Sequence, residues 1–244
     1  MKISLCIPMY NEEAIVSETV DMLTDYMNNR FGKDYEILLI NDGSSDRTEI
    51  LARKSAEKYE GVKVIGYTPN RGKGYAVRAG VTAASGEVVM FTDCDLAYGT
   101  DVIGEFYEAL KKDPDCDVAV GSRKIHPRGY EGYSFIRKLA SKTYRLLLRL
   151  FFGLTLSDSQ CGCKAFRKRA ADAIFSHCKI DRFAFDYEAI LVGQKAGARF
   201  CEIPVYIVNH RKSSIHLFRD TVRMLRDLSK MKKRIKKENI NLIR

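Results

Sequence analysis

The stretch GEVVMFTDCDL, residues 86–96, places an apolar run directly before two carboxylates, Asp93 and Asp95. An apolar run without polar alternation is typical of a strand buried on both faces of a sheet. The two carboxylates follow at the point where that strand ends. This stretch therefore predicts an α/β protein with a parallel sheet and with acidic side chains at one edge of it.

Similar apolar runs alternate with helical patterns along the first half of the chain. Strands that are separated by helices in this way build a mostly parallel sheet covered by helices on both faces. The expected strands are residues 3–8, 35–42, 62–67, 87–93 and 117–122, and the expected helices are residues 12–29 and those starting at Asp46, Gly74 and about Thr100.

Polar segments follow four of these strands: residues 8–12, 41–46, 93–95 and 121–123. Ligands of such sheets bind outside the carboxyl ends of the strands, so the four segments should meet at one edge. Each segment taken alone could also be an ordinary turn or helix cap. Carboxylates that recur on one edge repel each other unless a cation or a hydrogen-bonding ligand joins them, which favours a binding site.

Asp93 and Asp95 lie two positions apart at a strand end, where both carboxylates can reach one hard divalent cation. Mg²⁺ and Mn²⁺ are typically bound by one or two carboxylates together with substrate phosphates. We therefore expect a Mg²⁺ or Mn²⁺ site for a nucleotide diphosphate.

Five motifs carry a resemblance to a known family: CIPMYNEE (6–13), LLINDGSSDRT (38–48), NRGKGYAVRAG (70–80), VMFTDCDLA (89–97) and VAVGSR (118–123). In this order and spacing the chain resembles the family 2 glycosyltransferases with the GT-A fold, and among them the group that transfers sugar to polyprenyl or dolichyl phosphate.

Three further motifs are similar to the dolichyl-phosphate β-glucosyltransferase branch: DSQCGCKAF (158–166), RFAFDYEAI (182–190) and EIPV (202–205). Two features depart from that branch. Cys163 stands where the branch usually has Phe, and the N-terminal membrane anchor of the eukaryotic members is not seen in this sequence.

The resemblance implies a site for the nucleotide-sugar donor. It places Pro8, Tyr10 and Glu12 around the nucleoside and Asp42 against the base. It also implies that Asp93 lies near the ribose and the metal and that Asp95 is the direct metal ligand. Lys73, in NRGKG, is either a phosphate contact or a solvated residue at a helix start.

The acceptor that the resemblance implies is a lipid phosphate, which basic side chains would hold. Arg123, directly after the fifth strand, is the first candidate, and the others are Lys164 and the cluster Arg211, Lys212, Ser213 and Ser214. A solvated role is the alternative for Lys164 and Lys212.

Asp186 and Glu188 lie where relatives with hydroxyl acceptors place a catalytic base. A phosphate acceptor is already ionised and needs no strong base, so Asp186 could instead pair with Arg182 or Arg123. Attack on an α-linked nucleotide sugar would invert the anomeric centre and give a β-linked lipid phosphate.

The formal net charge is +10, which favours an acidic partner such as a phosphate-bearing substrate, an anionic lipid or nucleic acid. Acidic residues at the expected cleft would repel nucleic acid, so we expect none to bind. Seven cysteines without paired spacing, and no apolar signal peptide, predict reduced thiols and a cytoplasmic location.

The sequence predicts a catalytic domain over residues 1–210 and a basic helical extension over residues 211–244. Residues 135–156 form a basic, amphipathic pattern too short to span a bilayer. This helix and the extension are expected to hold the chain on the cytoplasmic face of an anionic membrane. The alternatives are an ordinary core helix and a solvated helix face.

Three other functions fit parts of the sequence. A mannosyltransferase that uses GDP-mannose, or a family 2 transferase with a hydroxyl acceptor, would keep the same fold and metal. A basic nucleic-acid-binding protein would explain KMKKRIKKE (230–238) but not the acidic strand ends. Neither the lipid nor the oligomeric state is set by these motifs.

Overall fold

The protein is described from a computed structural model, which describes residues 1–131, 148–149, 153–209, 227–235, 237–238 and 240. Seven strands form one sheet in the order β3-β2-β1-β4-β6-β5-β7. Their bounds are β1 Ile3–Met9, β2 Tyr35–Asp42, β3 Val62–Tyr67, β4 Val88–Phe91, β5 Val118–Ser122, β6 Lys164–Arg167 and β7 Phe200–Pro204.

Most neighbouring strands run parallel, and β6 is the exception. It pairs antiparallel with β4 on one side and with β5 on the other. The β5–β7 pair is parallel again. Because β6 runs the opposite way, the chain that leads into it, residues 161–163, lies at the same edge as the carboxyl ends of the parallel strands.

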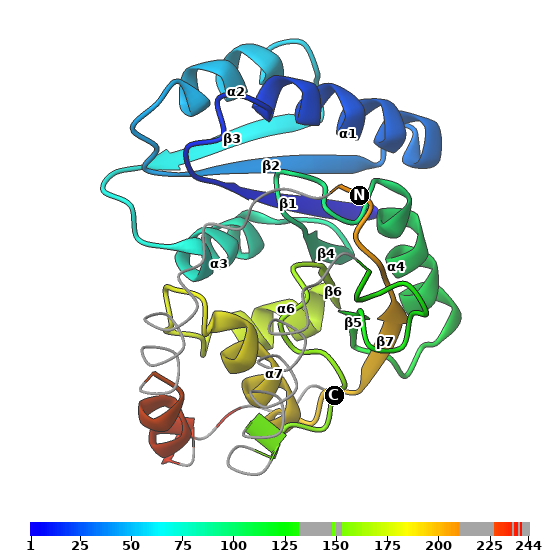
Figure 1. Cartoon of the computed structure of the whole chain (residues 1–244), viewed down its shortest axis with the longest axis vertical. Helices are drawn as coiled ribbons and strands as arrows, with labels where there is room; N and C mark the ends of the chain where they lie inside the picture. Colours follow the sequence, from blue (N-terminus) through cyan, green and yellow to red (C-terminus); the bar gives the residue numbers. More distant parts are fainter. Residues whose placement is uncertain (132–147, 150–152, 210–226, 236, 239, 241–244) are drawn as a thin grey trace.

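Helices cover both faces of this sheet, as the sequence predicts for a GT-A fold (Figure 1). One face packs against α1, α2 and α4, and the other against α3, α6 and α7. Their bounds are α1 Val16–Phe31, α2 Thr48–Ala56, α3 Lys73–Ala83, α4 Asp101–Lys112, α6 Lys168–Phe175 and α7 Phe185–Lys195.

Local chemistry sets where these elements begin and end. The fourth strand ends at Phe91, two residues earlier than expected, which lets the chain turn at Asp93. The second helix begins at Thr48 rather than at Asp46, and the Asp46 carboxylate, just before the helix, accepts the Thr48 backbone N–H at 2.9 Å.

Part of the basic C-terminal extension packs into the core. Residues 227–235 form a helix. The side chains of Leu228, Met231, Ile235 and Ile240 are buried in the same cluster as those of α3, α6 and α7. Its exposed side chains include Lys230, Lys233 and Lys237. This part of the extension is therefore amphipathic, with its apolar side on the catalytic domain.

The expectation that every cysteine is a reduced thiol is wrong for one pair. Cys116 and Cys201 form a disulfide that joins the start of β5 to β7. The other five cysteines are free and buried. Cys116 lies two residues before β5, and the pairing of β5 with β7 brings it to Cys201 although 85 positions separate the two in sequence.

No helix among the described residues is long and apolar enough to cross a membrane. Residues 135–147 and 150–152 of the expected interfacial helix, and residues 211–226 of the extension, lie outside the part of the chain that the structure describes.

Candidate active site

The carboxyl ends of β1, β2 and β4 lie side by side, and the expected site residues follow them. The register pairs Met9 of β1 with Asn41 of β2, and Cys6 of β1 with Phe91 of β4. Asp42 and Asp93 therefore lie at the same edge of the sheet, with β1 between the strands that lead to them. This arrangement confirms that the polar strand ends meet at one edge of the sheet.

Lys73, the first residue of α3, is ion-paired with Asp93. The two side chains are only 24% and 34% exposed. Burial lowers the pKa of Lys73, but the negative charges of Asp93, Asp186 and Asp95 outweigh this effect and raise its pKa. Lys73 is therefore a fixed cation within the acidic edge, and not a solvated helix residue.

Asp95 lies on the same loop as Asp93, close to other carboxylates. One oxygen accepts the Ala97 backbone N–H at 3.1 Å. Burial, followed by repulsion from Asp93 and Glu12, raises the pKa of Asp95. A carboxylate in such surroundings is stabilised when a cation binds beside it.

A glycine makes room for Asp93. The loop before β6 brings Gly162 so close that a Cβ atom at this position would collide with Asp93 Oδ2. A larger residue at this position would require the Asp93 carboxylate or the loop to move. The sequence signal for this contact was the glycine of QCGCK (160–164), but its partner is 69 positions away and no local pattern indicates it.

The residues present fit a divalent cation of the Mg²⁺ or Mn²⁺ type. Both prefer oxygen ligands, keep several waters and combine one or two carboxylates with substrate phosphates. Asp93 and Asp95 supply two carboxylates, and burial together with the charge of Asp93 raises the pKa of Asp95. Within the described residues there is no group of three or more His, Cys, Asp or Glu that could hold a metal without substrate.

Asp42 holds the loop that leads into α3. Its buried carboxylate accepts the backbone N–H groups of Arg71 and Gly72, at 2.9 and 2.8 Å, and the side-chain amide of Asn70 at 2.8 Å. Gly43 allows this approach, since a Cβ there would lie 2.6 Å from the Asn70 nitrogen. Asp42 thus orders residues 70–72, a function that its turn-like sequence context did not reveal.

The segment after β1 presents Tyr10 to solvent. Its side chain is 49% exposed, beside the backbone of Glu12, whose N–H donates to Thr48 Oγ1 at 2.7 Å. Pro8 lies within β1 and pairs with Ile40 of β2. An exposed aromatic ring at the open edge of a sheet is suited to contact a planar base.

Arg123 follows β5 and is held by Asp158, a partner that the sequence did not indicate. The guanidinium Nε and Nη2 donate to the two carboxylate oxygens at 2.7 and 3.0 Å. Burial raises the pKa of Asp158, but Arg123 holds it below the usual range. The pair fixes the orientation of the Arg123 guanidinium at the same sheet edge.

Lys164 does not reach the surface, which corrects the expectation that it contacts the acceptor phosphate. Its side chain is fully buried, and its ammonium donates to Asp186 Oδ1 at 2.5 Å and to the Cys161 carbonyl at 2.7 Å. Asp186 is therefore paired with Lys164, and not with Arg182 or Arg123. Burial raises the pKa of Asp186 although Lys164 and Lys73 oppose this.

The remaining candidates for the acceptor site, Arg211, Lys212 and Ser213, lie outside the described residues, as does the neighbouring Ser214. No geometry is assigned to them.

Comparisons with known proteins show the family of this chain. Residues 4–175 match the model of the family described as Glycosyl transferase family 2. A dolichyl-phosphate beta-glucosyltransferase of Trichomonas vaginalis is 30% identical over 210 residues, which cover 83% of this chain and 64% of that protein. The human dolichyl-phosphate beta-glucosyltransferase is 29% identical over 238 residues, covering 93% of this chain and 74% of that protein.

Solved structures support the fold. Glucosyl-3-phosphoglycerate synthase from Mycobacterium tuberculosis, in complex with UDP, superposes with a TM-score of 0.68 at 19% identity, covering 98% of this chain and 81% of that one. The same enzyme has been crystallised with Mg²⁺ and UDP, and that structure superposes with a TM-score of 0.67 at 19% identity, covering 93% and 79% of the two chains.

Proposed function

The chain belongs to glycosyl transferase family 2, and on this basis we propose that it transfers glucose from UDP-glucose to the phosphate of a dolichyl or other polyprenyl lipid. Its relatives named dolichyl-phosphate beta-glucosyltransferase support glucose as the transferred sugar and dolichyl phosphate as the acceptor. The chain spans about 64% of the length of the first of these relatives.

The observation that carries the proposal is the acidic pair Asp93 and Asp95, which follows β4, together with Lys73 at the start of α3, which is ion-paired with Asp93. A nucleotide diphosphate needs positive charge on its phosphates. Lys73 supplies one such charge, and a Mg²⁺ or Mn²⁺ ion held by Asp93 and Asp95 would neutralise the leaving diphosphate when bound. The Lys73–Asp93 ion pair supports this proposal, because it brings the lysine next to one of the proposed metal ligands.

The donor lies, in this proposal, across the carboxyl ends of β1, β2 and β4. Asp42 is proposed to lie against the base while it orders residues 70–72, and Tyr10 is proposed to contact the nucleoside together with Pro8 and Glu12. The exposure of Tyr10 and the hydrogen bonds of Asp42 support these roles.

The reaction is a single displacement at the anomeric carbon. An oxygen of the acceptor phosphate forms the new bond to C1 of glucose while the bond from C1 to the diphosphate oxygen breaks and UDP leaves with the electron pair. The acceptor oxygen is already ionised, so no proton has to be removed. Attack from the face opposite to UDP inverts the α-linked donor to a β-linked product.

Arg123 is the proposed contact of the acceptor phosphate. Asp158 fixes its guanidinium, and a planar guanidinium suits a phosphate better than an ammonium does. Arg211, Lys212 and Ser213 are proposed as further contacts on sequence grounds alone. Asp186 is occupied by Lys164, which fits a reaction without a general base.

A lipid acceptor requires contact with a membrane, and we propose that the exposed basic residues of the C-terminal helix provide it on the cytoplasmic face. Lys230, Lys233 and Lys237 are exposed while the opposite side of the helix is buried. Each such residue near an anionic leaflet contributes about 1 kcal/mol. Flotation with anionic and neutral vesicles tests this contact, comparing the wild type with the triple Lys→Gln variant at these positions.

One assay tests the activity. Purified protein is incubated with Mg²⁺ or Mn²⁺, a panel of UDP- and GDP-sugars and a short polyprenyl phosphate, and the lipid product is identified by mass. Glucosylated lipid formed from UDP-glucose supports the proposal. Mannosylated lipid from GDP-mannose, or transfer only to a hydroxyl acceptor, would replace the proposed substrates, and a salt-sensitive complex with DNA and no transfer would overturn the enzyme assignment.

A further inference from the structure

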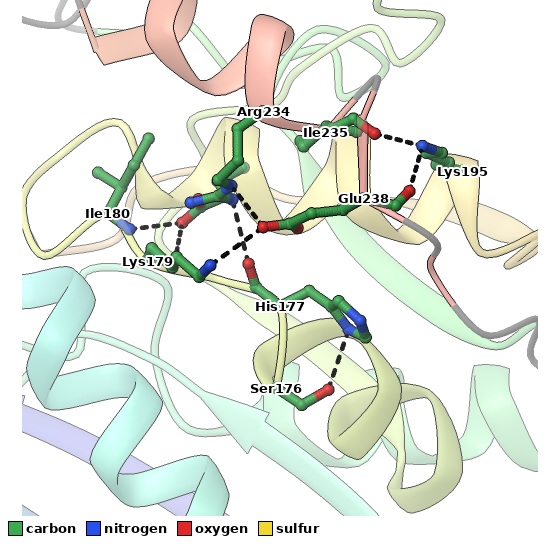
Figure 2. Close-up of polar contacts among 9 residues, drawn as sticks. Ser176, His177, Lys179, Ile180, Lys195, Arg234, Ile235 and Glu238 are labelled. Atoms are coloured by element: carbon green, nitrogen blue, oxygen red, sulfur yellow. Dashed lines mark hydrogen bonds and ion pairs between the residues drawn. The ribbon is translucent and has the colours of Figure 1, made fainter.

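The C-terminal helix is tied to the catalytic domain through one buried carboxylate, Glu188 of α7. Arg234 donates to Glu188 Oε1 at 2.5 Å and to the His177 carbonyl at 3.1 Å (Figure 2). The Glu188 side chain is fully buried, and that of Arg234 is 23% exposed. A buried carboxylate depends on such a partner, since removing one member of a buried pair leaves an uncompensated charge.

The other oxygen of Glu188 orders a loop. Glu188 Oε2 accepts the backbone N–H groups of Lys179 and Ile180, at 2.8 and 2.7 Å. Lys179, Ile180 and Arg234, which are labelled in Figure 2, thus all donate to this one carboxylate. Arg234 and the loop of residues 177–181 are thus held by one side chain.

The loop of residues 177–181 packs against the start of α3. The Asp181 carbonyl accepts the backbone N–H of Tyr75 at 3.1 Å. A Cβ at Gly72 would lie 2.5 Å from the Asp181 carbonyl oxygen, and a Cβ at Gly74 would lie 2.5 Å from that of Ile180. Two glycines are therefore required for the loop to lie against α3.

Lys73 is the residue between those two glycines, and it points to Asp93. Any shift of residues 177–181 would move the backbone on both sides of Lys73. The described contacts thus form a continuous path from Arg234 through Glu188 and the loop to Lys73.

We propose that Arg234 is a positioning residue for the nucleotide-sugar site: through Glu188 it fixes the loop of residues 177–181 and thereby the start of α3 that carries Lys73. The effect on donor binding rests on the proposed function, whereas the effect on the start of α3 does not.

The test compares Arg234→Gln with Arg234→Lys and with a matched control, Lys195→Gln. Lys195 also reaches the C-terminal segment, donating to the carbonyl oxygens of Ile235 and Glu238, but it does not contact Glu188 (Figure 2). Loss of Lys195 therefore weakens the attachment of the segment without removing the partner of Glu188.

Hydrogen exchange at residues 177–181 and at the first turn of α3 is the first measurement, at a temperature where all variants are folded. We expect faster exchange at the Tyr75 amide in Arg234→Gln, restoration in Arg234→Lys and wild-type exchange in Lys195→Gln. Unchanged exchange at Tyr75 in Arg234→Gln would overturn the proposal, whether or not the protein binds a nucleotide.

Calorimetry with UDP and Mn²⁺ is the second measurement. Arg234→Gln should bind UDP about tenfold more weakly, as expected for a mutation that acts through a contact path. When Arg234→Gln is added to Glu188→Gln, the double variant should bind UDP less than about twofold more weakly than Glu188→Gln alone. The reason is that both substitutions break the same Arg234–Glu188 contact. Additive effects would overturn the path through Glu188. Failure of the wild type to bind UDP would instead refute the proposed donor, with the exchange measurement still deciding the role of Arg234.

Discussion

The ammonium of Lys73, at the first residue of α3, is paired with the carboxylate of Asp93, just beyond the end of β4. Twenty residues separate the two in sequence, and two different elements deliver them to one point of the sheet edge. Lys73 thus contributes one positive charge to the acidic edge. Removing either charge should therefore change how the site holds a diphosphate.

Lys73→Gln should lower kcat/KM by about a hundredfold, a typical loss when one preorganised charge at a reacting group is removed. The melting temperature should fall modestly, because the substitution also removes the ion-pair partner of Asp93. The matched control is Lys54→Gln, an exposed lysine of α2. Full activity of Lys73→Gln would show that this lysine only neutralises Asp93.

Asp95→Ala should abolish turnover, with a loss of about a hundredfold or more, because the leaving diphosphate is no longer neutralised. Excess EDTA should have the same effect on the wild type. Asp25→Ala, at an exposed position of α1, serves as the control. Undiminished transfer by Asp95→Ala, or in EDTA, would refute the metal site.

Gly162→Ala should reduce donor binding and leave the rest of the fold intact. The new methyl group would collide with Asp93 Oδ2 and push that carboxylate away from Lys73. Calorimetry with UDP and Mn²⁺ measures the loss, and circular dichroism verifies folding. Wild-type affinity in this variant would show that Asp93 can move without consequence.

The stability of the protein should fall in acid because of Glu36. This carboxylate is buried, which raises its pKa, but hydrogen bonds from Ser4, Ser85 and Lys63 outweigh burial and bring the pKa to about 2. The unfolded chain binds the proton more tightly, with a pKa of about 4.3. The contribution of Glu36 is therefore complete above the unfolded pKa and is lost as the pH falls toward 2.

Urea unfolding at several pH values tests this dependence. The free energy of unfolding of Glu36→Gln should approach that of the wild type as the pH drops from about 5 to about 3. Glu57→Gln, at an exposed position, should track the wild type throughout. A gap between Glu36→Gln and the wild type that stays constant with pH would refute the linkage.

Cys201→Ala should lower the free energy of unfolding by about 2–4 kcal/mol under non-reducing conditions, because the Cys116–Cys201 bond closes a long loop in the unfolded chain. Reductant should remove most of this difference by opening the bond in the wild type. Mass spectrometry after alkylation counts the free thiols directly. Seven alkylated cysteines in the unreduced wild type would contradict the disulfide.

The parallel half of the fold could be predicted from the sequence because each strand is a continuous apolar run. The strands β2 and β3 begin and end at the predicted residues, and β1 and β5 differ by one residue at one end. β6 and β7 were not predicted as strands. KAFR (164–167) has only four residues and carries a lysine, and FCEIP (200–204) ends in a proline.

Within the site, sequence position was enough to bring Asp42, Asp93 and Asp95 to one edge, because carboxyl ends of parallel strands must meet there. Sequence position did not predict which side chains from distant segments form ion pairs with each other. The partners Asp158 for Arg123 and Lys164 for Asp186 depend on how β6 is inserted, which no local pattern reveals. The same insertion buries Lys164, whose sequence context suggests a surface loop.

The core cluster that contains Cys6 also contains Ile240, so it draws on residues from almost the whole range described here. During synthesis, the chain around Cys6 emerges from the ribosome long before its partners near Ile240. The apolar side chains that pack with Leu228, Met231, Ile235 and Ile240 remain open to chaperones and proteases until then, since exposed apolar surface is what makes incomplete chains prone to aggregate. Nascent chains stalled before Leu228 should therefore be degraded or held by chaperones, whereas chains released beyond Ile240 can complete this cluster.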